Sequence, residues 1–306
     1  MTSLFDLHCD MPTEAYGRSL SITDGSLMAS AAKAQSLDRY VQIAAIWSDC
    51  RLSDEAAYER YLAVRDYFRA QLDANGFTFA THSDGLTDGI PNYILAVEDA
   101  RLLAGDLSRL EGLYEDGVRF LTLTWSGESV IGGAFDTSAP LTDFGRCVVE
   151  ECFRLGIVPD LSHASDAVIE EVLAMAEARR KPVVATHSNA YAVHPHPRNL
   201  KDRYFKRIVA LGGIVGISFY PLHLCDGICS TKDVLAHIRH YLNLGGENCV
   251  CFGCDFDGIE ITPEGLSDLS SMSSLRDWLS EAGIAEKILD RLFYQNAYAF
   301  LTRAVH

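Results

Sequence analysis

Short runs of apolar, often β-branched residues alternate along the chain with longer segments in which apolar residues recur at helical spacing. This alternation is typical of βαβ units, which build parallel sheets. We expect strands at eight of the apolar runs, namely Leu4–Asp10, Tyr40–Trp47, Asn92–Glu98, Val118–Trp125, Ile157–His163, Pro182–His187, Gly213–Tyr220 and Asn248–Asp255. The segment Phe77–Ala80 is a candidate for a further, short strand.

The segments between these runs have the pattern of helices, several of them opened by an Asp, Ser or Thr that suits an N-cap and followed by a Gly-rich break. The predicted helices are Asp54–Leu72, Asp143–Leu155, Asp166–Arg179, Lys201–Leu211 and Thr231–Leu244. Eight strands with helical crossovers predict an α/β fold, a (β/α)8 TIM barrel that occupies residues 1–306 as one catalytic domain. An open, doubly wound sheet is the alternative. The last segment, Ile284–Val305, is predicted to form a helix that packs on the barrel.

Composition narrows the class of protein. With 48% hydrophobic and 22% charged residues the chain is globular, and no apolar run reaches the roughly 20 residues that cross a bilayer. The net charge of −16 argues against nucleic acid or an anionic membrane surface as a partner, which leaves small molecules. The first residues lack the basic and apolar regions of a secretory signal, and the nine cysteines have no framework spacing. We therefore expect a cytoplasmic protein with reduced thiols.

The ends of the predicted strands carry imidazole and carboxylate groups in apolar surroundings. In a barrel these ends meet at the active-site face. A lone strand histidine is more often a hydrogen-bonded core residue, and a lone strand-end aspartate is more often a helix cap. Burying several such groups together, however, costs several kcal/mol for each uncompensated charge, a cost that divalent cations remove. The pattern therefore predicts a metal site, with Zn²⁺ favoured by mixed nitrogen and oxygen ligands and Mn²⁺, Co²⁺ or Fe²⁺ as alternatives, built from His8, Asp10, Glu98, His163, His187 and Asp255.

Several longer motifs occur in order over nearly the whole chain: FDLHCDMP, LAVEDA, GVRFLTLTW, LGIVPDLSHAS, VVATHSNAYAVHPHPRNL, GISFY and FGCDFDG. In these motifs the chain resembles the membrane dipeptidase (renal dipeptidase) family of the amidohydrolase superfamily. The resemblance implies a dipeptidase with two Zn²⁺ ions per chain. It implies His8 and Asp10 as ligands of the first metal, His163 and His187 as ligands of the second, and Glu98 as the bridging carboxylate.

The same resemblance implies roles for residues around the metals. Asp255 resembles the acid/base that takes a proton from a metal-bridging hydroxide and delivers it to the leaving amine; whether it also ligates a metal is left open. Arg198 matches the arginine that holds the free carboxylate of a dipeptide, and Tyr220 is a candidate helper. Trp125 stands where better-known members have a substrate-contacting histidine. We expect Trp125 and Trp47 to form walls of the pocket.

The predicted function is therefore hydrolysis of dipeptides, with tolerance for a D-amino acid at the C-terminal position, and analogy with the family suggests a homodimer. Two alternatives remain at this stage. One is another amide or lactone substrate on the same centre, because a fold and its metals do not determine the substrate. The other is a metal-binding barrel without catalytic activity, which the tryptophan at position 125 favours.

Overall fold

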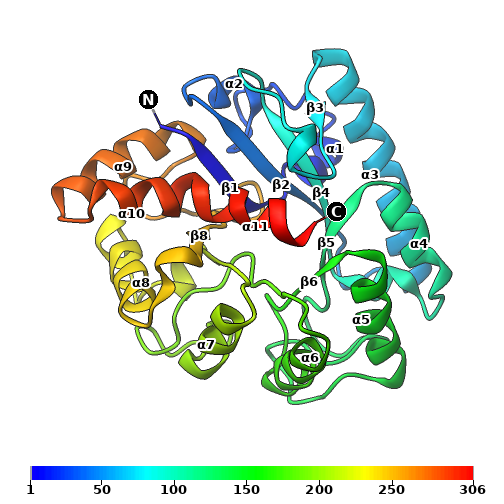
Figure 1. The fold of residues 1–306 in the computed structure, drawn as a ribbon. Helices are drawn as coiled ribbons and strands as arrows, with labels where there is room; N and C mark the ends of the chain where they lie inside the picture. Colours follow the sequence, from blue (N-terminus) through cyan, green and yellow to red (C-terminus); the bar gives the residue numbers. More distant parts are fainter. Residues whose placement is uncertain (1, 306) are drawn as a thin grey trace.

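The computed structural model describes residues 2–305, whose parallel strands curl into a barrel surrounded by helices (Figure 1). The hydrogen-bonded order is β6-β5-β4-β2-β1-β8-β7, and the short strand β3 pairs with β4. The strands are β1 Leu4–Cys9, β2 Tyr40–Trp47, β3 Thr78–Phe79, β4 Asn92–Glu98, β5 Val118–Thr122, β6 Val158–Asp160, β7 Val215–Ile217 and β8 Val250–Phe252. The predicted barrel is confirmed, and the segment around Phe77–Ala80 does contain a strand.

The sixth predicted strand, Pro182–His187, is wrong as a regular strand. This segment contributes only isolated bridges, Asp160 to Val184 and Ala185 to Val215, and these bridges join β6 to β7 and so complete the ring. The reason is that side chains from another segment bond its backbone. The backbone N–H of Thr186 donates to the Asp160 carboxylate at 2.9 Å, and that of His187 donates to Ser162 Oγ at 3.1 Å. Because side chains accept the backbone donors, the ladder is interrupted where the segment approaches the barrel mouth.

The five predicted helices are present, with ends that move by up to three residues: α3 Asp54–Asn75, α5 Asp143–Leu155, α6 Asp166–Arg179, α7 Asp202–Ala210 and α8 Thr231–Asn243. Capping explains four of their starts, because Ser53, Thr142, Ser165 and Ser230 each accept a backbone N–H of the first turn. Four helices had not been predicted, α1 Met11–Arg18, α2 Ala31–Ala34, α4 Ser108–Glu115 and α9 Met272–Glu281. Among residues 2–305, no helix combines the length and the apolar character that a bilayer crossing needs.

The C-terminal segment is helical and crosses one end of the barrel (Figure 1, orange to red). It consists of α10 Glu286–Asp290, a π-helical turn at Arg291–Gln295 and α11 Asn296–Ala304. Phe300 and Leu301 share a buried cluster with Phe5, Val41 and Phe120, which come from the strands. Because Phe5 and Val41 lie near the first residues of their strands, this segment covers the amino ends of the strands. The carboxyl ends are left free for a site.

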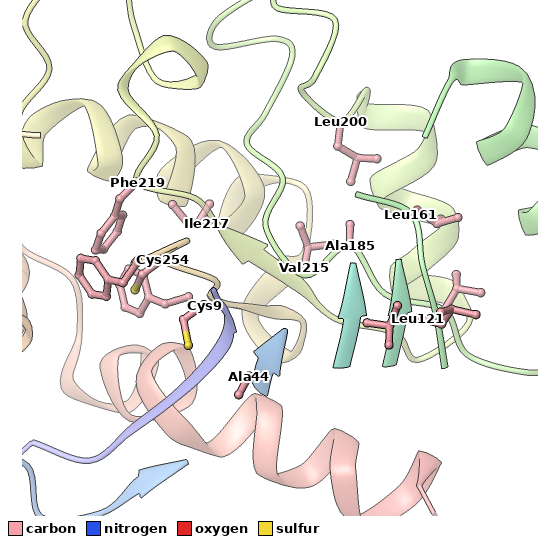
Figure 2. Close-up of a cluster of buried hydrophobic side chains, with 14 of the residues drawn as sticks. Cys9, Ala44, Leu121, Leu161, Ala185, Leu200, Val215, Ile217, Phe219 and Cys254 are labelled. Carbon is pink, nitrogen blue, oxygen red and sulfur yellow. The ribbon is translucent and has the colours of Figure 1, made fainter. Parts of the chain in front are cut away.

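A second apolar layer separates the strands from the outer helices, and Figure 2 shows part of it. Cys9 belongs to this layer, as strand alternation predicts for the residue between His8 and Asp10. The register of β1 against β2 passes from Asp6 opposite Gln42 to Cys9 opposite Ala44, so β1 has one extra residue there. Such a bulge bends a strand and turns its side chains. It turns His8 toward the barrel mouth.

The expectation of reduced thiols is wrong for two of the nine cysteines. Cys225 and Cys229 form a disulfide, with Cα atoms 6.0 Å apart, in the loop after the short helical turn η3, Pro221–His223. The loop folds back on itself there and brings the two Cα atoms within the usual range for a disulfide. The other seven cysteines are free among the described residues.

Candidate metal centre and its cavity

A cavity of about 920 Å³ opens at the carboxyl ends of the strands. Seven of the nine predicted site residues line it: Asp10, Glu98, Trp125, His163, Arg198, Tyr220 and Asp255. The other two, His8 and His187, are each 1% exposed and lie directly beneath these side chains. The structure therefore brings all nine predicted residues to one place.

The first group of polar atoms surrounds His8, which the bulge in β1 turns toward the mouth. Its Nε2 lies 3.6 Å from Asp10 Oδ2, 3.5 Å from Glu98 Oε2 and 3.8 Å from Asp255 Oδ1. Asp10 follows β1 and Asp255 follows β8, and these strands are neighbours in the sheet. One imidazole thus faces three carboxylates that come from three strand ends.

The second group lies on the other oxygen of Glu98. Oε1 of Glu98 is 2.9 Å from His163 Nε2 and 3.4 Å from His187 Nε2. The two imidazole Nε2 atoms are themselves 2.9 Å apart. Glu98 therefore presents one carboxylate oxygen to each group, which is the arrangement that a carboxylate bridging two cations requires.

Hydrogen bonds determine which ring nitrogen of each histidine carries the proton. His163 Nδ1 donates to the backbone carbonyl of Trp125 at 3.1 Å, because a carbonyl can only accept. Thr186 Oγ1 donates to Asp160 Oδ2 at 2.6 Å, so it accepts from His187 Nδ1 at 2.8 Å. Both Nε2 atoms then hold lone pairs, and burial lowers the pKa of His163 to about 4. Lone pairs thus converge on one point, which favours a cation there.

Unpaired polar atoms also mark the first group. His8 Nε2 and Asp10 Oδ1 are buried and have no hydrogen-bond partner among residues 2–305. Two sets of ligand atoms lie within 4.8 Å of one another, His8 with Glu98 and His187, and His8 with Asp10 and Asp255. Imidazole nitrogens with carboxylate oxygens are donors that suit Zn²⁺ and related divalent ions. The residues present therefore fit a metal centre, and Asp255 lies within reach of it.

Two residues of the centre have backbones in the left-handed region. Both His163 and Asp255 have φ of 66°, a conformation that costs non-glycine residues on the order of 1–3 kcal/mol. For Asp255 the surroundings impose it, because its N–H donates to the His8 carbonyl at 3.1 Å and its own carbonyl accepts from Gly258. A Cβ at position 258 would meet the carboxylates of Asp10 and Asp255, so this tight turn requires glycine.

Asp255 has an environment that favours the protonated carboxyl group. Burial is the largest effect and raises the pKa of Asp255 well above its usual value. The negative charges of Asp10 and Glu98 act in the same direction, while His8 opposes them. A carboxyl group of this kind, at the edge of the cavity, can hold and release a proton.

Arg198 presents a buried positive charge to the cavity. It is 4% exposed, and its one side-chain hydrogen bond among the described residues is from Nη1 to Ser188 Oγ at 3.3 Å. Its Nε and Nη2 atoms have no partner within residues 2–305. Burial lowers the pKa of Arg198 to about 10, which still leaves it charged at neutral pH. A buried guanidinium with unused donors is suited to binding a carboxylate.

Aromatic residues form part of the cavity wall. Trp125 and Trp47 both line the cavity, and their rings meet edge to face with centroids 5.0 Å apart. Tyr220 also lines it and packs edge to face on His223, with centroids 4.7 Å apart. Trp125 has a second contact with the centre, because its carbonyl accepts the hydrogen bond from His163 described above.

Sequence reasoning missed several residues of this site, among them His223, Thr186 and Asp160. His223 lines the cavity beside Arg198, and burial together with that positive charge lowers its pKa far below the usual value. Thr186 and Asp160 lie behind His187 and orient its ring. Thr186 was within a recognised motif, next to a predicted ligand, which is the signal that could have found it. No pattern in the sequence indicates His223, which follows the end of β7 by six residues.

Comparison with known proteins identifies relatives of this chain. The family model described as membrane dipeptidase (peptidase family M19) matches residues 1–304. An uncharacterised dipeptidase of Schizosaccharomyces pombe is 32% identical over 220 residues, which are 68% of this chain and 53% of that protein. A dipeptidase of Aspergillus oryzae is 31% identical over 269 residues, 80% of this chain and 62% of that protein. The chain thus spans between half and two thirds of the length of these two relatives.

A solved structure supports the same relationship. The crystal structure of a metallopeptidase from Rhodobacter sphaeroides, liganded with a phosphinate mimic of the dipeptide L-Ala-D-Ala, superposes with a TM-score of 0.92. The two sequences are 26% identical, and the match covers 99% of each chain. Together with the family model, which matches nearly every residue, these similarities show that the chain belongs to the membrane dipeptidase family, peptidase family M19.

Proposed function

We propose that this protein is a dipeptidase that uses two divalent metal ions, Zn²⁺ first among the candidates. The observation that carries this proposal is the position of Glu98, whose two carboxylate oxygens face two separate groups of ligand atoms. Membership of a metallopeptidase family supports the same chemistry. A barrel that only binds metal would not need the unpaired guanidinium of Arg198 beside the centre.

In this proposal the ligands divide between the two groups already described. His8 and Asp10 would hold the first ion, His163 and His187 would hold the second, and Glu98 would contribute one carboxylate oxygen to each. Asp255 lies 3.8 Å from the first group, measured from Oδ1 to His8 Nε2, so it can also approach the first ion. Thr186 and the carbonyl of Trp125 keep the Nε2 atoms of the second group free of protons.

The remaining residues bind the substrate and move protons. When bound, the two ions would supply a hydroxide nucleophile at neutral pH and polarise the scissile carbonyl. Asp255 would take up the proton of the nucleophile and deliver it to the leaving amine, as a general base and then a general acid. Arg198 would hold the C-terminal carboxylate of the dipeptide, with Tyr220 beside it. Trp125 and Trp47 would exclude water from one side of the cavity.

The stereochemistry of the substrate is part of the proposal. The structural relative from Rhodobacter sphaeroides was crystallised with a mimic of L-Ala-D-Ala, which supports acceptance of a D-residue at the C-terminal position. Trp125 is expected to affect substrate binding, because it stands where better-known family members have a histidine that contacts the substrate. We therefore propose dipeptides with an L-residue followed by a D-residue as the substrate class.

A panel of dipeptides tests the proposed function. The zinc-loaded protein should hydrolyse L-Ala-D-Ala and Gly-D-Ala, and a chelator should abolish the hydrolysis. Restoring Zn²⁺, and in parallel Mn²⁺ or Co²⁺, should return the activity and identify the preferred metal. Binding of metal without hydrolysis of any dipeptide would refute the proposed dipeptidase activity. It would instead support the alternative of a metal-binding barrel without catalytic activity, which the tryptophan at position 125 favours.

A further inference from the structure

Three arginines line the cavity, Arg18, Arg60 and Arg198, and they differ in their partners. Arg18 pairs with Glu14 at 3.1 Å and also bonds Ser26 at 2.9 Å. Arg198 is the anchor for the substrate carboxylate in the proposed function. The guanidinium of Arg60 makes no hydrogen bond or ion pair within residues 2–305, although it is half-buried. The cavity thus offers two guanidinium groups that lack a carboxylate partner.

Two acidic residues of the cavity wall, Glu14 and Asp257, are already bonded elsewhere. Glu14 is paired with Arg18, and both oxygens of the Asp257 carboxylate accept backbone N–H groups, from Met28 at 2.7 Å and Ala29 at 2.9 Å. The guanidinium of Arg60 lies instead against the ring of Tyr16, 5.7 Å from its centroid. An aromatic face offsets part of the cost of burying a cation but leaves its N–H donors unused.

The topology places Arg60 across the barrel from Arg198. Arg60 lies on α3, which follows β2, whereas Arg198 follows the segment 182–187. In the closed ring β6-β5-β4-β2-β1-β8-β7 this segment lies between β6 and β7, so four positions separate it from β2 in either direction. The two groups of metal ligands, contributed by the ends of β1, β4 and β8 and by His163 and His187, lie between them.

Because Arg198 and Arg60 lie on opposite sides of the same cavity, a dipeptide bound between them would direct one end toward each arginine. With its C-terminal carboxylate on Arg198 and its peptide bond at the metal ligands, its N-terminal residue extends toward the wall that carries Arg60. We infer that Arg60 binds an acidic side chain on that N-terminal residue, so that dipeptides beginning with L-Glu or L-Asp are preferred. This inference rests on the proposed function and names the substrate class of the same site.

Kinetics with charged and neutral substrates of the same shape test the inference. We expect the zinc-loaded wild type to hydrolyse L-Glu-D-Ala with a kcat/KM about tenfold above that for L-Gln-D-Ala, as one charge-assisted contact at a half-exposed site would produce. Arg60→Met should bring this ratio close to one, and Arg60→Lys should keep part of it. Arg18→Met is the matched control, because it removes a cavity arginine that is already paired, and it should preserve the ratio.

The outcomes separate this inference from the proposed function. If the wild type hydrolyses L-Ala-D-Ala but the Glu-to-Gln ratio is the same in Arg60→Met, the role of Arg60 is refuted and the dipeptidase stands. If the Arg60-dependent preference is found for L-Ala-D-Glu over L-Ala-D-Gln instead, its assignment to the N-terminal residue is wrong. If no dipeptide is hydrolysed, the proposed function itself fails. Thermal unfolding of each variant shows that the fold is intact.

Discussion

The Nε2 atoms of His163 and His187 lie 2.9 Å apart, and neither has a proton to donate to the other. Each ring has its proton on Nδ1, which donates to Trp125 O in one case and to Thr186 Oγ1 in the other. The Glu98 oxygen lies at 2.9 and 3.4 Å from the same two atoms. Three electron-rich atoms so close together repel one another unless a cation lies among them.

This orientation predicts that Thr186 controls metal affinity through His187. Thr186→Val keeps the shape of the side chain but removes the acceptor for His187 Nδ1, so zinc affinity should fall about 10- to 100-fold. Thr186→Ser keeps the hydroxyl group and should therefore have nearly the zinc affinity of the wild type. Thr122→Val is the control, because Thr122 donates to the same Asp160 carboxylate at 2.7 Å without bonding a ligand histidine in this structure. Competition with a chromogenic chelator measures the affinities, and wild-type affinity in Thr186→Val would disprove the role.

Asp255 is predicted to transfer protons during catalysis and not to be required for binding the metal ions. Asp255→Asn removes the proton acceptor at nearly constant size, so kcat should fall by about 10² to 10⁴. Metal analysis of the same sample should still find both ions. A variant with near-normal kcat would exclude Asp255 as the proton shuttle, whereas loss of one ion would show that it is needed as a ligand.

Arg198 is predicted to recognise the free carboxylate of the substrate. Arg198→Ala should raise KM for dipeptides by about 10- to 100-fold, since it removes a charge-assisted contact of roughly 1.5–3 kcal/mol. C-terminally amidated dipeptides bind without that contact and should be affected much less. If both kinds of substrate lost affinity equally, Arg198 would have a structural role only.

His237 is predicted to make the fold sensitive to mild acid. Its ring is buried, its Nδ1 accepts from the Ala190 N–H and its Nε2 donates to the Leu224 carbonyl, both at 3.0 Å. Burial lowers its pKa from 6.5 to about 4. Between these two pH values, His237 is therefore protonated in the unfolded chain but neutral in the folded chain. This contribution to stability is complete above pH 6.5 and is lost as pH falls toward 4, by about 3 kcal/mol.

Chemical denaturation across that range of pH, with His237→Gln as the comparison, measures the effect. The glutamine side chain can donate and accept but does not titrate, so the variant should lose less stability between pH 6.5 and 4 than the wild type. Parallel curves for the two proteins would show that His237 does not contribute to the acid sensitivity.

Much of the fold could be predicted because strands and helices differ in the spacing of apolar residues. The long strand β2 and the helices α5 and α6 were predicted with their observed bounds. The segment 182–187 could not be predicted correctly, since its ladder is interrupted by side chains of Asp160 and Ser162, which lie far from it in sequence. The helix α1 was missed because its eight residues follow β1 directly, with no intervening turn.

The candidate site also combines residues that the local sequence pattern predicts with residues that only long-range packing brings into place. Residues at strand ends could be predicted, because the barrel brings all such ends to one face. His223 and Arg60 lie on segments whose path depends on long-range packing, so neither could be predicted from local pattern. The disulfide between Cys225 and Cys229 depends in the same way on how the loop after η3 folds back. The orientation of His187 by Thr186 and Asp160 likewise becomes evident once the side chains are placed.

The central claim is that two metal ions bridged by Glu98 hydrolyse a dipeptide, and a zinc titration tests it most directly. Zn²⁺ is added in steps to metal-free protein while the hydrolysis of L-Ala-D-Ala is followed. We predict that activity reaches its plateau at two equivalents of Zn²⁺ per chain. Full activity at one equivalent would contradict the binuclear centre, and two bound equivalents with no hydrolysis would contradict the dipeptidase.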